Sequence, residues 1–114
     1  MTHVYKIVSQ SEWRAAEAAG VFSGAAVDLA DGFIHFSAAD QVEETAAKYF
    51  AGQTDLLLVA VKAAALGEAL RWEVSRGGAP FPHLYALLPL ESVARVHPLP
   101  LGADGRHDFS AVLE

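Results

Sequence analysis

Three short stretches of the sequence carry polar side chains set among apolar ones, and their spacing could place them around one pocket. Alternate residues of an extended strand share a face, so each stretch presents a polar pair on one side. The pairs are His35 and Ser37 in "FIHFS", Arg71 and Glu73 in "RWEVS", and His83 and Tyr85 in "FPHLY". If the three faces meet, imidazole, carboxylate and hydroxyl groups line a polar pocket that could bind or transform a small ligand.

Ordinary structural roles compete with this hypothesis. An isolated His35 could simply donate to a backbone carbonyl, and Ser37 is favoured as the N-cap of the following helix rather than as a catalyst. Gln41, one helical turn further on, could be solvated. Glu73 and Arg71 could form a surface pair worth about 0 to 1 kcal/mol.

Structural and functional roles also compete for the remaining aromatic residues and for the second histidine. Trp72 is more often a core residue than a stacking platform, and Tyr85 could anchor its hydroxyl at a sheet edge. His83 differs, because the two prolines of "PFPHLY" fix the backbone before it. A packing histidine would not need that restraint, which favours a functional role for His83.

Several site classes are excluded by composition and motif. The chain has no cysteine, which rules out disulfides, thiol catalysis and thiolate metal sites. The five histidines show no metal-ligand spacing, so we expect no metal site. Glycine-rich phosphate loops and the Gly-x-Ser-x-Gly nucleophile motif are also missing from the sequence.

Length, charge and hydropathy predict one soluble cytoplasmic domain spanning residues 1–114. The 114 residues are 53% hydrophobic and 19% charged, which is typical of a globular protein. The net charge of -6, with scattered lysines and arginines, disfavours non-specific binding to nucleic acid or to anionic membranes. The start of the chain does not read as a signal peptide, and Lys62 interrupts the longest apolar run.

The elements that must position these residues follow from periodicity and capping signals. Ser9 and Glu12 form a capping box for a helix that Gly20 ends, whereas residues 21–31 read as a loop with some apolar anchoring. Ser37 is expected to cap a second helix that runs to Phe50. Strands are expected at 4–8, 32–37, 55–62, 71–75, 83–87 and 92–99, with a helical turn around Leu66. This order predicts an α+β fold with two helices in the N-terminal half and a mostly antiparallel sheet.

Much of the chain also resembles a known family. The run "DGFIHFSAADQVEETAAKYFAGQTDLLLVAV", followed by "LRWEVS" and "FPHLYALLPLESVARV", closely resembles the uncharacterised bacterial family called domain of unknown function 952 (DUF952). The likeness extends from roughly Val4 to Pro98. It implies membership of the ADP-ribosyltransferase-like fold group, whose small split, mostly antiparallel sheet holds a cleft that binds NAD.

The resemblance also implies roles for the polar residues. His35 would contact a ribose or a phosphate, and Tyr85 or Trp72 would stack on a ring. Glu73 would be the charged group, because cleavage of the glycosidic bond of NAD builds positive charge on the ribose. NAD would then be a substrate rather than a bound cofactor, and His83 has no clear counterpart in the fold group.

Three functions therefore remain open. The first is a small transferase or hydrolase acting on NAD or an ADP-ribose-type substrate, and the second is a non-catalytic module for a nucleotide-like or other small anionic ligand. The third is a partner-binding domain that uses the apolar segment "FPHLYALLPL". The candidate catalytic residues are Glu73, His35 and His83, and the candidate ligand-binding residues are Ser37, Gln41, Arg71, Trp72 and Tyr85. A shift of one residue in "LRWEVS" would exchange Glu73 for Trp72 at the pocket.

Overall fold

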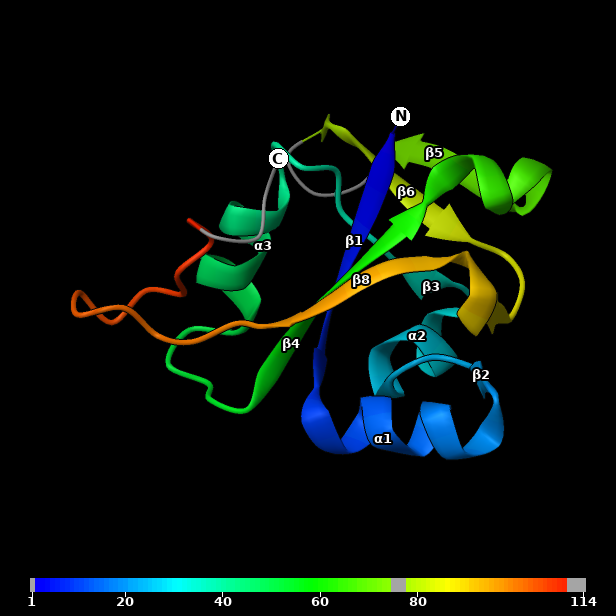
Figure 1. Ribbon diagram of the computed structural model, residues 1–114. Coiled ribbons are helices and arrows are strands. Elements are labelled where there is room, and N and C mark those ends of the chain that lie inside the picture. Colours follow the sequence, from blue (N-terminus) through cyan, green and yellow to red (C-terminus); the bar gives the residue numbers. More distant parts are fainter. Residues whose placement is uncertain (1, 75–77, 111–114) are drawn as a thin grey trace.

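The computed structural model describes residues 2–74 and 78–110, which form an α+β fold with antiparallel strand pairing (Figure 1). The helices are α1 (Gln10–Ala19), α2 (Ala26–Asp31) and α3 (Val42–Tyr49). The strands are β1 (His3–Ser9), β2 (Val21–Phe22), β3 (Ile34–His35), β4 (Leu56–Lys62), β5 (Leu70–Val74), β6 (Pro80–Leu84), β7 (Leu88–Pro89) and β8 (Val93–Pro98). Short 3-10 turns cover Ala63–Ala65, Gly67–Ala69 and Leu90–Ser92.

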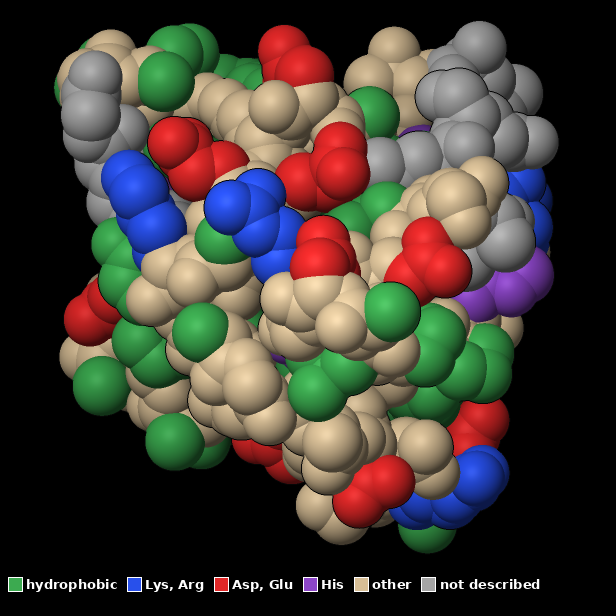
Figure 2. All heavy atoms as spheres, turned by 90° about the vertical axis from the view of Figure 1, so that its left-hand side faces the viewer, with side chains coloured by type: hydrophobic (Ala, Val, Ile, Leu, Met, Phe, Trp, Pro, Cys, Tyr) green, Lys and Arg blue, Asp and Glu red, His purple; other side chains and the backbone are tan. Residues whose placement is uncertain are grey.

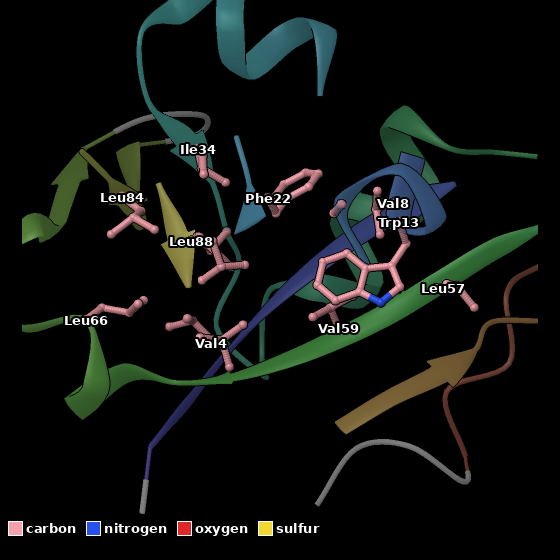
Figure 3. Packing of buried hydrophobic residues seen from close by; sticks show 13 residues of the cluster. Val4, Val8, Trp13, Phe22, Ile34, Leu57, Val59, Leu66, Leu84 and Leu88 are labelled. Carbon is pink, nitrogen blue, oxygen red and sulfur yellow. The ribbon is translucent and has the colours of Figure 1, made fainter. Parts of the chain in front are cut away.

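Two three-stranded sheets, ordered β1-β4-β8 and β3-β6-β5, build most of the molecule, and β2 pairs with β7 beside them. The strand β4 is central and is buried on both faces, as its continuous apolar run predicts. One face of its sheet packs on the core that contains Trp13, Phe22 and Leu88 (Figure 3). The other face packs on Val42 and Ala46 of α3.

In the first half of the chain, local sequence signals predict one helix correctly and miss another. The capping box of Ser9 and Glu12 is present, and Gly20 ends α1 in the left-handed conformation with φ of 83°. The expected loop at 21–31 is wrong, because it contains β2 and α2. The backbone N–H at the start of α2 donates to Asp28 at 2.8 Å, and Gly32 ends that helix with φ of 87°.

Two other boundaries differ from expectation. Ser37 does not cap a helix, because its backbone is bonded to Tyr5 and α3 begins only after a turn, with Gln41 at the N-cap position. The strand expected at 83–87 lies earlier in the chain, because β6 begins at Pro80 and ends at Leu84. Prolines fit there because Pro82 turns its backbone toward β3, where its carbonyl accepts from the N–H of Phe36 at 3.0 Å, so β5 loses no hydrogen bond.

Most of the apolar segment "FPHLYALLPL" lies inside the fold rather than on its surface. Phe81, Leu84 and Leu88 are buried, and only Tyr85 and Leu87 among its large residues are exposed. The segment therefore packs as β6 and β7 instead of offering a continuous apolar surface to a partner. In the part of the chain that the structure describes, no helix has the length and apolar character needed to cross a membrane.

Candidate functional site

A pocket of about 500 Å³ lies at the edge of β1, between α2 and α3. Three consecutive residues of β1, Tyr5 to Ile7, line it. Because consecutive side chains point to opposite faces of a strand, a pocket lined by all three meets the strand at its edge. The other lining residues are Val27, Asp31, His35, Phe36, Ser37, Thr45, Tyr49 and Phe50. The volume falls within the range of about 300 to 1,000 Å³ that is typical of small-molecule sites.

The pocket exists because the two sheets join at one point and then separate. Tyr5 donates its backbone N–H to the carbonyl of Ser37 at 2.8 Å, and the return bond from Ser37 is 2.9 Å long. Two residues earlier on the β3 side, the N–H of His35 donates to the carboxylate of Asp28 at 3.1 Å instead of to β1. The side chain from α2 therefore holds the strands apart beside Ile7.

Asp28 is the buried centre of the first polar cluster, with its side chain 1% exposed. Its carboxylate accepts from Nζ of Lys6 at 2.8 Å and contacts Nδ1 of His35 at 2.7 Å. Burial alone would raise the pKa of Asp28, but the hydrogen bond from His35 and the charge of Lys6 outweigh it and lower the pKa to about 2. Burial also lowers the pKa of Lys6, and Asp28 partly offsets that effect.

The second nitrogen of His35 faces another carboxylate. Nε2 lies 2.9 Å from Oδ2 of Asp31, whose side chain is 48% exposed at the wall of the pocket. The pocket wall thus places an imidazole nitrogen beside a carboxylate.

Glu73 is the centre of a second cluster, on β5 and β6. Its Oε1 lies 2.8 Å from Nδ1 of His83 and accepts from the hydroxyl of Tyr85 at 2.7 Å. The bond from Tyr85 and then that from His83 lower the pKa of Glu73, and the same carboxylate raises the pKa of Tyr85. The guanidinium of Arg71 lies 5.0 Å from the centre of the Tyr85 ring.

Phe33 connects the two clusters. Its ring stacks on His83 with 4.2 Å between centroids, and it lies 4.6 Å from His35 and 5.2 Å from Tyr85. The two imidazoles are 5.5 Å apart. The structure therefore brings His35, His83 and Glu73 together as the strand alternation predicts, but of these three only His35 lines the pocket described above.

The other predicted ligand residues take different positions. Ser37 lines the pocket, where its Oγ lies 3.1 Å from Oγ1 of Thr45. Gln41 instead links two segments of the chain. Its side-chain N–H donates to the carbonyl of Pro80 at 2.7 Å, and its side-chain oxygen accepts from the N–H of Ala38. Trp72 is 47% exposed and alternates with Glu73, so the expected register is correct and Trp72 faces away from the cluster.

Sequence reasoning missed the polar residues Lys6, Asp28 and Asp31, the connecting ring of Phe33, and most of the pocket lining, including Tyr49 and Phe50. The sequence contains a signal for Lys6 and for the two aspartates. Lys6 is the only charged residue within the apolar strand "VYKIV", and two aspartates three residues apart precede "GFIH". Lys6 and Asp28 lie 22 residues apart in the chain, and strand alternation alone does not reveal a contact between them.

Solved structures of similar proteins show the same fold. The crystal structure of protein CC0527 from Caulobacter crescentus is 57% identical, with 96% of each chain covered and a TM-score of 0.92. A solution NMR structure of CC0527 from the same organism covers 99% of this chain and 97% of that chain, with 57% identity and a TM-score of 0.89. No curated protein matches the chain significantly. The family model described as "Protein of unknown function (DUF952)" matches residues 7–96, so the chain belongs to the DUF952 family.

Proposed function

We propose that this protein binds a nucleotide-like small molecule in the pocket between β1 and α2, with the ribose against Asp31 and His35. The observation that carries the proposal is the half-exposed carboxylate of Asp31 on the pocket wall, held 2.9 Å from Nε2 of His35. A carboxylate has several lone pairs, so Asp31 can accept from a ribose hydroxyl while it contacts His35, and carboxylates are common partners of ribose hydroxyls. Tyr49 and Phe50 supply an aromatic side for the base.

The position of the pocket supports this ligand class. It lies where the two antiparallel sheets separate, and the ADP-ribosyltransferase-like arrangement expected from the sequence places an NAD-binding cleft at a split sheet. We therefore also propose that the chain belongs to the ADP-ribosyltransferase-like fold group. NAD and ADP-ribose are the first ligands to test.

The charges around the pocket indicate which part of the ligand it holds. The charge of Lys6 is matched by Asp28, and Asp31 adds a carboxylate at the wall. A phosphate placed next to Asp31 would face a like charge, so we expect the ligand's phosphates to lie away from that carboxylate and the neutral nucleoside to fill the pocket. On the face shown in Figure 2, the lysine and arginine side chains at the upper left and at the lower right have acidic neighbours, which supports a small ligand rather than a nucleic acid.

Thermal unfolding in the presence of NAD, ADP-ribose, adenosine or inorganic phosphate tests the proposal. A ligand at 100 times its Kd should stabilise the fold by about 2.7 kcal/mol. We expect a shift with the three adenosine-containing ligands and none with phosphate, lost in Asp31→Asn and kept in the exposed control Asp40→Asn. Equal shifts in both variants, or none with any of these three ligands, would contradict the proposal.

A second candidate is transferase or hydrolase activity on NAD or an ADP-ribose-type substrate. The observation that favours it is the Glu73 carboxylate, kept ionised by Tyr85 and His83 and joined to His35 through Phe33. Such a carboxylate could stabilise positive charge that develops on a ribose. The test is release of nicotinamide from NAD, compared with Glu73→Gln and His35→Ala. If the wild-type chain releases none, the enzymatic proposal fails while binding stands.

A further inference from the structure

The outer edge of β5 has free backbone groups among the described residues. Alternate residues of an antiparallel strand bond to the same neighbour, and Tyr85 donates its N–H to the carbonyl of Ala69 at 2.8 Å. Arg71 and Glu73 therefore also bond to β6. Trp72 and Val74 do not, and they stand opposite prolines that have no N–H. The N–H and C=O groups of Trp72 and Val74 therefore point outward.

Two of the features that normally prevent strand pairing, proline and lysine, are absent from β5 as the structure describes it. The strand is regular over Leu70–Val74, and neither a proline nor a lysine interrupts it. Two apolar side chains on one face of the strand are exposed to solvent, with Trp72 47% and Val74 75% exposed. An edge of this kind is a template for another strand.

We propose that the occupant is β5 of a second copy, paired antiparallel around Trp72. In that register Trp72 stands opposite its own copy, and Arg71 stands opposite Glu73 of the partner subunit, and the reverse. Both cross-strand pairs are then of opposite charge. The paired N–H and C=O groups of Trp72, with the N–H of Val74 and the C=O of Leu70, would join the two β3-β6-β5 sheets into one.

The pairing would also alter the Glu73 cluster. Arg71 of the partner subunit would approach the face of β5 that holds Glu73 and Tyr85, because Arg71 and Glu73 share that face. The dimer would add a cation beside a carboxylate that already contacts His83. The edge is short, so we expect a small and weak interface.

Analytical ultracentrifugation of the full chain, from micromolar to millimolar concentration, tests this proposal. We expect the mass to rise from 12.1 kDa toward twice that value. Arg71→Glu and Glu73→Arg each place like charges opposite one another and should weaken association about tenfold. An equal mixture of the two variants restores both pairs and should associate like the wild type. Arg14→Glu, on the exposed face of α1, is the matched control.

Val74→Pro provides a second test that leaves the charges unchanged. It removes an N–H that points outward and costs β5 no bond to β6, so it should abolish association while the melting temperature stays close to that of the wild type. A wild-type chain that remains monomeric at millimolar concentration overturns the proposal. Association that persists in Val74→Pro, or a mixture of charge variants that stays monomeric, overturns it as well.

Discussion

Two histidines in this fold each contact a carboxylate at nearly the same distance, yet the two sites differ in burial. Nδ1 of His35 lies 2.7 Å from Asp28, and Nδ1 of His83 lies 2.8 Å from Glu73. The side chain of Asp28 is 1% exposed, whereas that of Glu73 is 37% exposed. A buried carboxylate needs its partners to remain charged, while water can replace the partners of an exposed one.

The difference in burial predicts different effects of substitution at the two carboxylates. Asp28 holds α2, β1 and β3 together through Lys6 and His35, so it builds the pocket without lining it. Glu73 contacts His83 and Tyr85 and is partly exposed to solvent. We therefore expect substitutions at Asp28 to act on folding, and those at Glu73 to act on the surface chemistry.

The largest expected effect is that of Asp28→Asn. The change leaves the Lys6 charge buried without a counter-charge and weakens the contact with His35, so it should cost about 3 to 5 kcal/mol of unfolding free energy. Urea denaturation measures this cost. Asp31→Asn, whose side chain is half exposed, is the matched control and should cost about 1 kcal/mol or less. Similar losses in the two variants would remove the distinction between buried and exposed carboxylates.

Acid should weaken the fold through Asp28. Its folded pKa of about 2 lies below the ordinary value of 3.8, so the stabilisation is present above pH 4 and is lost as the pH falls through about 4 to 2. The pKa difference corresponds to about 2 kcal/mol. The unfolding free energies of wild type and Asp28→Asn should therefore converge by that amount over this pH range. A constant difference between them would show that Asp28 is not the group that titrates.

A much smaller effect is expected for Glu73→Gln. The glutamine amide can still accept from Tyr85, and the site is solvated, so the urea midpoint should stay close to that of the wild type. Urea denaturation beside Asp28→Asn gives the comparison directly. A loss comparable to that of Asp28→Asn would mean that the Glu73 cluster is a structural centre too.

The smallest effect is spectroscopic. The hydrogen bond to Glu73 raises the pKa of Tyr85, so Glu73→Gln should lower that pKa toward its ordinary value. Ultraviolet absorbance titration of the tyrosinate band reports it, with Tyr85→Phe identifying the transition among the three tyrosines. An unchanged titration in Glu73→Gln would show that the bond is not maintained in solution.

Local patterns predict the parts of this fold whose signals lie within one segment. The capping box of Ser9 and Glu12, the buried run of β4 and the shared face of Arg71 and Glu73 follow directly from the sequence. The six-residue helix α2 was missed because its N-terminal donor is satisfied by Asp28, a residue that also serves β1 and β3.

The pocket itself depends on contacts between distant segments. Neither Lys6 nor Asp28 carries a motif, and the link through Phe33 requires that β3, β5 and β6 be assembled. Ser37 shows the same limit, since pairing with Tyr5 prevails over its preference for a helix cap. Prediction from a single sequence therefore reached the histidines but not the carboxylate that positions one of them.

A titration of the ¹⁵N-labelled chain with ADP-ribose, followed by two-dimensional NMR, tests the proposed binding site most directly. Saturable shifts are expected for the backbone amides of Ile7, Asp31 and Thr45, which line the pocket, while Trp13 in the core stays unchanged. Spectra that do not change at millimolar ADP-ribose, or shifts confined to residues outside the pocket, would contradict the proposed binding site.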